Sequence, residues 1–545
     1  MRGLTLLGLC ALTCSAAARS AAHVGMKELD DMRPRQRNNV RSDPKPSYQP
    51  QKKTSTIIPQ NTNTTKFAVN GTGLPDVDFD IGESYAGLLP ISSAANASEL
   101  YFWFFPSSNP NATDEITIWL NGGPGCSSLE GLFQENGPVI WQYGTYKPIK
   151  NPWTWVNLTN MLWVEQPVGT GFSQGTHRAT SVEETSQEFL GFFKNFIDTF
   201  GLHNRKIYIA GESYAGYYVP YLADAMFNAQ NKYYYDVQST IVYDPSTSYN
   251  VVQRQIPAVP FVDYNHQLFN LNKTFLADIH NRSKACGYTN FMDKYLTFPP
   301  SGPLASPPNA SAPGCDLWTD IYYAASLVNP CFDIYQVTTT CPLLWDVLGF
   351  PGSFDYLPSG ASVYFNRTEV QKAINAPVQP WTECSGGVLK QNTSPPSGLS
   401  VLPRVIERSK RTVIAHGSLD YILIANGTLL MIQNMTWHGA QGFRSAPQTD
   451  FFVPYHSTSL SQQEISAINA HNVSSEIMGT LAASGVMGTT HTERGLTWVD
   501  VALSGHMVPQ YQPSAAYRQL EFLLGRIESL SQVGPFTTDP GNWGN

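Results

Sequence analysis

A short strand, a tight turn that carries a serine and a helix follow one another in the middle of the chain. Lys206–Ala210 is apolar and β-branched, as expected of a buried strand. Ser213 lies in the next six residues, Gly211–Gly216, and Tyr217–Met226 is predicted to be a helix. This order is a nucleophile elbow, in which the turn exposes the serine hydroxyl and the helix N-terminus directs backbone N–H groups at developing negative charge. We therefore predict that Ser213 is a catalytic nucleophile.

The same hexapeptide, Gly-Glu-Ser-Tyr-Ala-Gly, also occurs at Gly82–Gly87. This copy follows an acidic stretch, Asp76–Asp80, and leads to Pro90, where a helix would need a free N–H. We expect Ser84 to lie in an early strand or turn and to take no part in catalysis. The repeat is too short to indicate a duplicated domain.

Strand and helix patterns alternate on both sides of the elbow. The predicted strands outside it are Ile116–Leu120, Met161–Glu165, Thr412–Ala415 and Thr497–Ala502. The predicted helices are Ser181–Phe200, which has an apolar face of Phe, Leu and Ile, and Ser514–Leu530. This alternation predicts an α/β fold of the α/β-hydrolase type, with a mostly parallel central sheet flanked by helices.

The alternation is lost between about Asn228 and Arg404, where Pro and Gly become frequent and four cysteines cluster. We expect this segment to be an insertion that caps the catalytic face. The predicted organisation is a signal peptide (1–18), a flexible leader or propeptide (19–66), the first part of the core (67–227), a disulfide-containing cap insertion (228–404) and the second part of the core (405–545).

A serine nucleophile needs a base, and the base needs a partner that fixes its tautomer. In α/β-hydrolases these follow the serine in the order acid, then histidine. Asp420 follows the strand that ends at Ala415, and His506 follows the strand that ends near Leu503, so both lie where open α/β sheets bind ligands. We predict that Asp420 and His506 complete the triad. His416 precedes Asp420, which is the wrong order, and the other histidines considered lie in poorly patterned segments: His438, His456, His471 and His491.

A glycine-rich loop, Asn121–Ser128, follows the first predicted strand. Glycine allows backbone N–H groups to approach a ligand closely. In this fold one oxyanion donor comes from such a loop and the other from the residue after the nucleophile. We assign these two donors to the backbone N–H groups of Gly123 and Tyr214.

The N-terminus is predicted to direct export. Arg2, the apolar stretch Leu4–Leu12 and the small residues Ser15–Ala18 form a signal-peptide pattern. The chain also carries many Asn-x-Ser/Thr sequons, which favours a secreted glycoprotein. These are Asn63, Asn70, Asn96, Asn111, Asn157, Asn272, Asn281, Asn309, Asn366, Asn392, Asn426, Asn434 and Asn472. We expect an extracellular protein without a membrane anchor, since no later segment is apolar over the length of a bilayer and the C-terminus lacks an apolar tail.

Six cysteines remain after the signal peptide, and an even number in an exported chain favours three disulfides. They are Cys126, Cys286, Cys315, Cys331, Cys341 and Cys384. No C-x-x-C or H-E-x-x-H pattern occurs, so we expect no metal and no other cofactor. Charged residues are only 14% of the chain and the net charge is −8, which argues against nucleic acid or an anionic membrane as a partner.

Together, Asn121–Ser128, Gly211–Gly216 and Gly505–Pro509 resemble the three signatures of the serine carboxypeptidase family, in particular of its fungal secreted members. The resemblance extends from about Tyr85 to Leu524. It implies an α/β-hydrolase core with an insertion, and release of single residues from the free C-termini of peptides and proteins, favoured at acidic pH. Ala215 ends the Gly-x-Ser-x-Gly pattern where glycine is usual, which is the family's own variant.

The resemblance also implies roles for particular residues. Asn121, Gly122, Glu135 and Glu212 would bind the terminal carboxylate of the substrate, and Cys126 would pair with Cys384. The other four cysteines can pair in three ways. If Glu135 and Glu212 are buried close together, one must hold a proton, because like charges raise the apparent pKa of the pair. A protonated glutamate can then donate a hydrogen bond to the substrate.

Three other functions fit parts of the pattern. One is an esterase on the same fold, and another is an acyltransferase that keeps the triad but excludes water as the acceptor. The third is a secreted binding protein whose hydrolase fold is catalytically inactive. The Asn121–Ser128 loop together with the two glutamates favours carboxylate recognition, and a triad in the right order favours catalysis.

Overall fold

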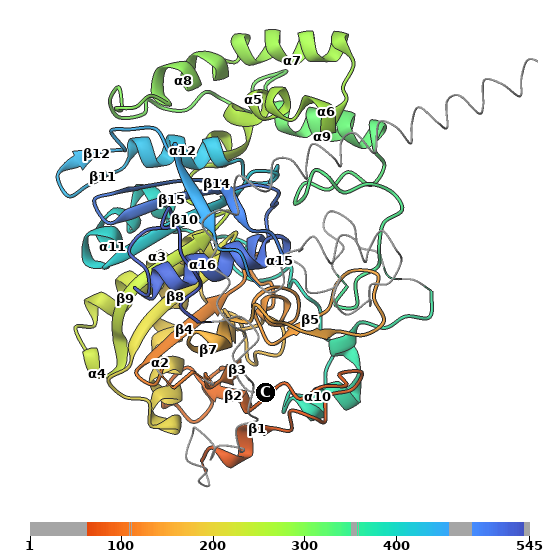
Figure 1. Cartoon of the computed structure of the whole chain (residues 1–545), viewed down its shortest axis with the longest axis vertical. Coiled ribbons are helices and arrows are strands. Elements are labelled where there is room, and N and C mark those ends of the chain that lie inside the picture. Colours follow the sequence, from red (N-terminus) through yellow and green to blue (C-terminus); the bar gives the residue numbers. More distant parts are fainter. Residues whose placement is uncertain are drawn as a thin grey trace, which may run out of the picture. The chain divides into compact units, whose positions relative to one another are not determined.

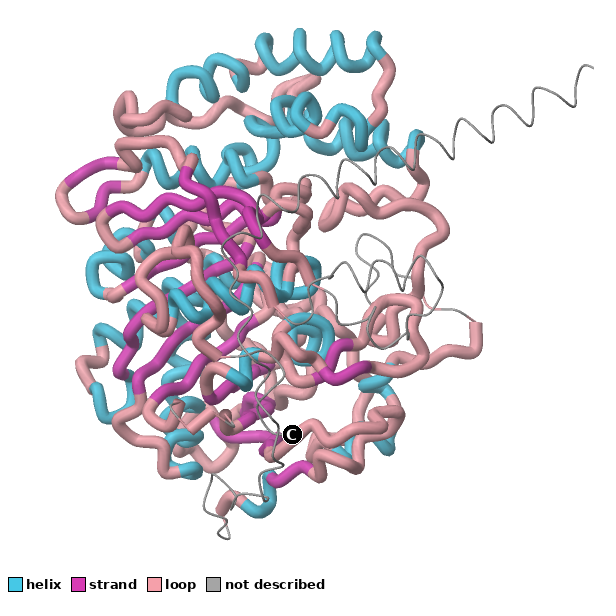
Figure 2. The backbone as a smooth tube through the Cα atoms, in the orientation of Figure 1, coloured by secondary structure: helices cyan, strands magenta, loops and turns pink. Residues whose placement is uncertain are grey.

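The computed structural model describes residues 63–107, 109–110, 112–349, 357, 359–456 and 482–538. The predicted signal peptide lies outside these residues, and so does the predicted leader except for its last four positions. Within the described residues, a sheet of eleven strands forms the centre of the fold (Figures 1 and 2). Its strands, in spatial order, are β1 (Ala68–Val69), β2 (Ser84–Pro90), β3 (Glu99–Phe105), β7 (Asn160–Glu165), β4 (Glu115–Leu120), β8 (Lys206–Glu212), β9 (Asp236–Tyr243), β10 (Arg411–Gly417), β15 (Leu496–Val501), β14 (Gly485–Glu493) and β13 (Thr449–Val453).

The middle of the sheet is parallel, from β7 through β4, β8, β9 and β10 to β15. The flanking pairs are antiparallel. All residues of β4 and β7 are buried, as expected of strands covered on both faces. This confirms the predicted α/β-hydrolase architecture, a mostly parallel sheet with helices on both sides.

Alternating side chains of the sheet enter two separate hydrophobic cores, one on each face. Phe102 and Phe104 pack against the aromatic face of α2 (Val182–Phe200), with ring centroids 5.5 and 5.2 Å from Phe196. α3 (Ala215–Asn228) belongs to the same core. Trp103 and Phe105 point to the opposite face, into the core that includes α16 (Pro513–Leu523). Two apolar faces explain why these strands have no polar alternation.

The remaining helices lie around the sheet and in the insertion. They are α4 (Lys232–Tyr235), α5 (Ile256–Tyr264), α6 (His266–Phe269), α7 (Lys273–Ala285), α8 (Tyr288–Tyr295), α9 (Leu317–Val328), α10 (Thr368–Ala373), α11 (Leu402–Arg408), α12 (Ala425–Asn434) and α15 (Val508–Tyr511), with single turns η1 (Thr65–Phe67), η2 (Gly131–Glu135), η3 (Trp155–Asn157), η4 (Val251–Gln255), η5 (Tyr364–Asn366) and η6 (Ser397–Leu399). Two small hairpins pair β5 (Val139–Ile140) with β6 (Ile149–Lys150) and β11 (Thr436–Trp437) with β12 (Ala440–Gln441). None of the described helices combines the length and the apolar character needed to cross a membrane.

The insertion begins later than its predicted boundary at residue 228. Asp236–Tyr243 forms β9 in the middle of the sheet, between β8 and β10. Gln238, Ser239 and Thr240 interrupt its apolar pattern, although all three are buried, which is why the sequence did not mark it as a core strand. After β9 the helices α5–α9 lie together, next to α12 (Figure 1), and share a third hydrophobic core.

Most of the other predicted elements are confirmed to within one or two residues. Ser84 begins β2, an early strand, as expected. The final helix is shorter than predicted, because α16 ends at Leu523 and Gly525 adopts a left-handed φ of +74° that stops the helix. Three disulfides join Cys126 to Cys384, Cys286 to Cys315 and Cys331 to Cys341. The first is the pair that the resemblance implied, and the other two select one of the three open pairings.

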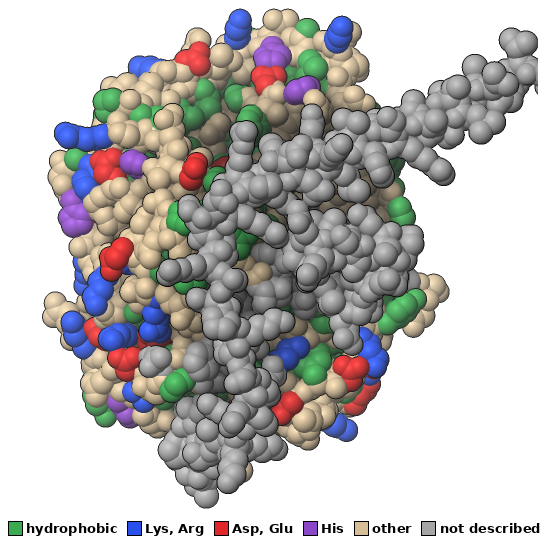
Figure 3. All heavy atoms as spheres, viewed as in Figure 1, with side chains coloured by type: hydrophobic (Ala, Val, Ile, Leu, Met, Phe, Trp, Pro, Cys, Tyr) green, Lys and Arg blue, Asp and Glu red, His purple; other side chains and the backbone are tan. Residues whose placement is uncertain are grey.

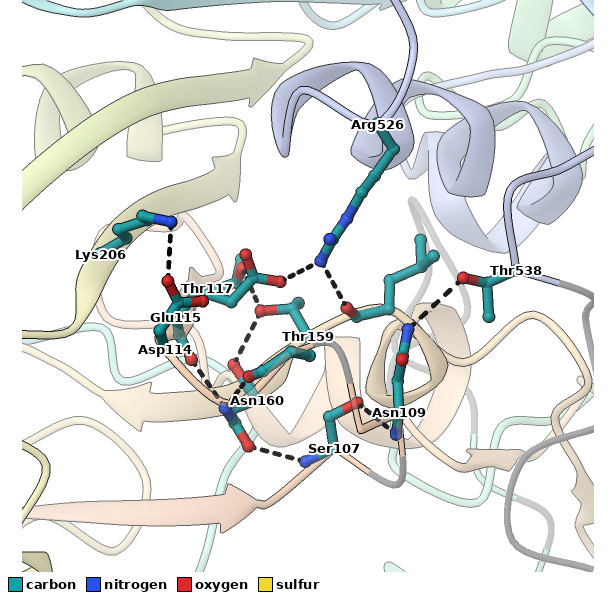
Figure 4. Close-up of polar contacts among 12 residues, drawn as sticks. Ser107, Asn109, Asp114, Glu115, Thr117, Thr159, Asn160, Lys206, Arg526 and Thr538 are labelled. Atoms are coloured by element: carbon teal, nitrogen blue, oxygen red, sulfur yellow. Dashed lines mark hydrogen bonds and ion pairs between the residues drawn. The ribbon is translucent and has the colours of Figure 1, made fainter.

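Polar contacts tie the C-terminal segment to the amino ends of the central strands (Figure 4). Arg526 Nη2 lies 2.5 Å from Glu115 Oε1 at the start of β4. Asn160, at the start of β7, donates to the carbonyl oxygens of Ala112 and Glu115, both at 2.7 Å. Asn109 Nδ2 donates to Thr538 Oγ1 at 3.4 Å. These contacts lie at the end of the sheet opposite the predicted catalytic residues, so they stabilise the core without entering the site.

On the face shown in Figure 3, outside the grey atoms, Lys and Arg side chains lie among Asp and Glu side chains. No broad area of one charge sign stands out on that face. This distribution is in keeping with the low charge content of the chain.

Candidate active site

Ser213 lies at the turn between β8 and α3 with a backbone φ of +60°, a left-handed conformation that is strained for serine. Its N–H donates to Tyr243 O at 2.9 Å, and its carbonyl oxygen accepts the N–H groups of Gly216 and Ser246, both at 2.9 Å. The glycines on either side leave room for this turn. A Cβ at Gly211 would lie 2.4 Å from Leu120 O, so a side chain there would push the strand away.

The predicted acid and base come together beside the turn. Asp420 follows β10 and His506 follows β15, and Nδ1 of His506 lies 2.8 Å from Oδ2 of Asp420. Asp420 Oδ1 accepts the backbone N–H groups of Ile422 at 2.8 Å and Leu423 at 3.2 Å. His506 is held from its own backbone, whose N–H donates to Tyr335 O at 2.8 Å. Nε2 of His506 is buried without a hydrogen-bond partner among the described residues.

The competing histidines lie elsewhere. His416 is on β10, buried behind Asp420, and burial, together with the charge of His506, lowers its pKa to about 3. His456 packs edge to face with Trp153, with ring centroids 4.5 Å apart, and His491 packs in the same way with Phe443 at 4.8 Å. None of the three lines the cavity that contains Ser213. His438 is also absent from that lining, and His471 lies outside the described residues.

The glycine-rich loop packs directly against Ser213. A Cβ on Gly122 would lie 2.7 Å from Ser213 Cβ and 2.6 Å from Tyr214 N, so only glycine fits at this position. This close approach places the backbone of Gly122 next to Ser213 and next to Tyr214, the residue that precedes α3. The Cys126–Cys384 disulfide anchors the far end of the loop to the insertion. The arrangement can place two backbone N–H groups near an oxygen that becomes negative next to Ser213.

The predicted carboxylate-binding residues also meet. Asn121 Nδ2 lies 2.9 Å from Glu212 Oε1 and 3.4 Å from Glu135 Oε1. Asn121 Oδ1 accepts Trp119 Nε1–H at 2.7 Å, which fixes the orientation of the amide. One oxygen of each glutamate, Oε2, is buried without a hydrogen-bond partner among the described residues. Of the two glutamates, Glu212 lines the cavity that contains Ser213.

Burial dominates the electrostatics of this pair. It raises the pKa of Glu135 to about 7, although hydrogen bonds from Glu212 and Asn121 act in the opposite direction. Burial also raises the pKa of Glu212 well above its usual range, and the charge of Glu135 adds to the effect. The pair therefore holds protons at acidic pH, and Glu135 loses its proton as the pH rises through about 7.

Two acidic residues near the site, Glu130 and Asp244, were not predicted from the sequence. Glu130 lines the cavity, and its Oε2 accepts a hydrogen bond from Asn121 at 3.3 Å. Burial and the charge of Glu135 raise its pKa as well. The only indication of Glu130 in the sequence was an acidic residue between Leu129 and Gly131, in a segment that is otherwise apolar or small.

The second acidic residue, Asp244, directly follows β9 and lies next to Asp420.

Ser213 and His506 line one cavity of about 970 Å³. Its wall also includes Gly122, Gly123, Glu130, Glu212 and Tyr214. Asn121 and Glu135 are not part of the wall. Asn121 contacts it through its hydrogen bond to Glu212. Ser213, His506, the candidate oxyanion donors and two acidic side chains, Glu130 and Glu212, therefore share the wall of one cavity.

One group of described side chains has the composition of some metal sites. Single oxygen or nitrogen atoms of Asp244, His416 and Asp420 lie within 4.8 Å of one another. The oxygens of Asp420, however, already accept N–H groups from Ile422, Leu423 and His506. We assign no metal to this group, because a cation would have to displace contacts that orient the histidine.

One predicted glycosylation site is wrong for the folded chain. Asn157 is only 4% exposed and its Nδ2 donates to Pro152 O, so a glycan cannot be accommodated there. Asn63, Asn70, Asn96, Asn272, Asn281, Asn309 and Asn366 are exposed, whereas Asn392, Asn426 and Asn434 are half-buried. Asn111 and Asn472 lie outside the described residues.

The parallel sheet, with Ser213 at a strand-to-helix turn, places the chain among the α/β-hydrolases. Comparison with known proteins narrows this class. The family model described as serine carboxypeptidase matches residues 75–525. A probable serine carboxypeptidase of Arthroderma benhamiae is 55% identical over 553 residues, covering 98% of this chain and 100% of the relative. Serine-type carboxypeptidase F of Aspergillus niger is 46% identical over 484 residues, covering 86% of this chain and 88% of the relative.

The solved structure of Kex1(delta)p, a prohormone-processing carboxypeptidase from Saccharomyces cerevisiae, has the same fold. Its TM-score is 0.64 at 22% identity, covering 86% of this chain and 98% of that chain. The chain therefore belongs to the serine carboxypeptidase family, as its motifs predicted. It is a serine-type carboxypeptidase.

Proposed function

We propose that the enzyme releases single residues from the free C-termini of peptides and proteins, with an acidic pH optimum and an acyl-enzyme mechanism. The observation that carries this proposal is the buried cluster of Asn121, Glu135 and Glu212 beside the nucleophile. A general esterase has no need for a carboxylate-binding cluster at this distance from its serine.

The chemistry follows from the geometry of three side chains. His506 Nε2 takes the proton of Ser213 as the hydroxyl oxygen attacks the last peptide carbonyl. Asp420 holds Nδ1–H of the imidazole, so that Nε2 is free to act as the base. The backbone N–H groups of Gly123 and Tyr214 stabilise the tetrahedral oxyanion. His506 then protonates the departing residue, and water attacks the acyl-enzyme by the same steps in reverse order.

Substrate binding depends on protons held by the glutamates. Below about neutral pH, a protonated Glu135 or Glu212 donates a hydrogen bond to the substrate carboxylate. As the pH rises, Glu135 loses its proton first, at a pKa of about 7, and the growing negative charge of the pair repels the same carboxylate. The raised pKa values therefore support tight binding at acidic pH and its progressive loss as the pH rises.

Glu212→Gln is expected to flatten the pH dependence of KM. For a free-acid peptide the KM of the parent enzyme should rise at least about tenfold between about pH 5 and about pH 8, because like charges at contact distance repel strongly. Glutamine has no proton to lose, so the variant should show a smaller rise. Glu83→Gln, in the other copy of the hexapeptide, is the matched control and should keep the profile of the parent. An unchanged profile in Glu212→Gln would remove this role.

The exopeptidase proposal is tested by a pair of substrates that differ only at the end. A peptide with a free C-terminus should be cleaved with a kcat/KM at least about a hundredfold above that of its C-terminal amide, since the amide cannot occupy the protonated glutamate pair. The released products are identified by mass spectrometry at acidic pH. Equal rates for the two peptides would favour an esterase-like hydrolase instead.

We also propose that the protein acts outside the cell. The predicted signal peptide and the exposed sequons support this location. Mass spectrometry of the culture medium of the source cells would test it, with the mature N-terminus read from the same sample.

A further inference from the structure

Asp244 lies against the face of Asp420 that His506 does not use. It follows β9 with a backbone φ of +42°, a strained conformation for aspartate, and its side chain is fully buried. The backbone N–H of Gly417 donates to its Oδ1 at 3.0 Å. One carboxyl oxygen of Asp244 lies within 4.8 Å of one of Asp420, and a side-chain hydrogen bond between the two acids contributes to the raised pKa of Asp244. Two carboxyl groups can hydrogen-bond to each other only if one of them holds a proton.

The surrounding donors determine which of the two holds it. Asp420 accepts three N–H groups, from Ile422, Leu423 and His506, and each of them favours the ionised carboxylate. Asp244 accepts fewer N–H groups than Asp420 does, and no positively charged side chain contacts it among the described residues. The shared proton therefore belongs to Asp244, and Asp420 accepts it as a fourth hydrogen bond.

The far side of Asp244 is neutral as well. Gln253 is oriented by its carbonyl oxygen, which accepts the backbone N–H groups of Thr247 and Ser248, so its Nε2 donates to Thr428 Oγ1 at 2.9 Å. The Thr428 hydroxyl then donates to His416 Nε2 at 2.9 Å. Nδ1 of His416 is left with the hydrogen and faces Asp244 Oδ1 at 3.1 Å, in a bent geometry.

We propose that Asp244 is a positioning residue that works as a neutral carboxylic acid, donating a hydrogen bond to Asp420 and so holding that carboxylate in line with His506. A row of donors runs from Gln253 through Thr428 to His416, whose Nδ1 lies 3.1 Å from Asp244 Oδ1 without a hydrogen bond. The hydrogen bond from Asp244 fixes the direction of the Asp420 carboxylate without placing a second negative charge next to it. A carboxylic acid kept neutral in an apolar site can act as a strong donor.

The electrostatics of the site support this assignment. Burial raises the pKa of Asp244 well above its usual range, and the charge of Asp420 adds to the effect. His416 stays neutral, because burial lowers its pKa to about 3. The ionisable groups that face Asp244 are Asp420 and His416 from β10, Asp500 from β15, Glu212 from β8 and its own neighbour Tyr243. None of them supplies a positive charge that would stabilise an ionised Asp244.

The test compares Asp244→Asn with Asp244→Ala. Asparagine is neutral and can still donate to Asp420, so its kcat should stay within about threefold of the parent, whereas alanine should lower kcat about 10- to 100-fold, the equivalent of one hydrogen bond to a charged group. KM should change little in either variant, because Asp244 does not touch the substrate. Rates are expressed per active site, counted with an organofluorophosphate that labels Ser213.

Asp500→Asn is the control. It removes another acid near Asp244, but one to which we assign no contact with Asp420, so kcat should stay unchanged.

Two results would overturn the proposal. If Asp244→Asn lowers kcat as much as Asp244→Ala does, the enzyme depends on the ionised form of Asp244. If alanine leaves kcat per active site unchanged and alters only the melting temperature, Asp244 is a structural residue. Should the alanine variant not fold, infrared spectra decide. The difference between the parent and Asp244→Asn at neutral pH should contain the carbonyl band of an un-ionised carboxylic acid, and its absence would also overturn the proposal.

The inference rests on the proposed role of Asp420, but its failure can be told apart from a failure of the proposed function. The alanine-to-asparagine ratio can be measured on any substrate that the site turns over, whether it ends in an acid, an amide or an ester. The exopeptidase proposal, in contrast, depends on the preference for the free acid.

Discussion

Replacing Ser213 with alanine should lower kcat by roughly a millionfold, the loss seen when the nucleophile of a serine-based triad is removed. The left-handed turn presents Ser213 to the cavity that His506 also lines. The fold should survive the change, since alanine removes a single oxygen from the turn. Activity is measured as C-terminal trimming of a peptide at acidic pH, with the melting temperature as a check on folding.

The chain provides its own control for this substitution. Ser84 occupies the same place in an identical hexapeptide, but it is buried in β2 and only 2% exposed. Ser84→Ala should therefore keep the activity of the parent. Its labelling by an organofluorophosphate should also be the same as that of the parent. A Ser213→Ala enzyme that trims peptides at more than about a thousandth of the parental rate would contradict the assigned nucleophile.

Asp420→Asn should lower kcat by about ten-thousandfold, because the substitution inverts the imidazole tautomer. Oδ1 of Asp420 faces two backbone N–H donors, from Ile422 and Leu423. An asparagine will turn its carbonyl oxygen towards these donors and its NH₂ group towards His506. Nδ1 must then accept a hydrogen bond, the proton moves to Nε2, and Nε2 can no longer take the proton of Ser213.

Kinetic constants, labelling rates and the melting temperature separate this explanation from a loss of structure. A wrong tautomer leaves the oxyanion donors and the substrate site intact, so KM should change little while kcat falls. Organofluorophosphate labelling should slow in parallel with kcat, and the melting temperature should stay close to that of the parent. A loss of less than about tenfold would mean that His506 is oriented by its backbone contacts alone.

The sequence was sufficient for the parts of the site that have a local pattern. Ser213, Asp420 and His506 each follow a buried strand in the middle of the sheet, so strand patterns and chain order predicted their neighbourhood. The family resemblance then supplied Asn121, Glu135 and Glu212, which the structure brings together. Their contacts join segments distant in the chain, as between Asn121 and Glu212, which are 91 residues apart.

The rest required three-dimensional information. Strand β9 was missed because buried polar residues replace part of its apolar pattern, and their hydrogen-bonding neighbours in the sheet are not visible in one sequence. Asp244 is followed by a proline and has the local pattern of a turn residue. Only the packing of β9 against β10 places it beside Asp420. Asn157 has a perfect sequon, and nothing local indicates that its side chain lies in the interior.

The long helical insertion leaves the sheet after β9 and the chain returns at β10, two strands that are hydrogen-bonded neighbours. Exit and re-entry therefore sit side by side, and the length of what lies between them puts no mechanical demand on the strand register. Much of this segment can therefore be replaced to accept new side chains, provided that the residues it contributes to the site are kept: Asp244, Tyr335, whose carbonyl oxygen holds His506, and Cys384, which anchors the glycine-rich loop. Grafting the corresponding segment from one family member onto another is thus a rational route to altered selectivity.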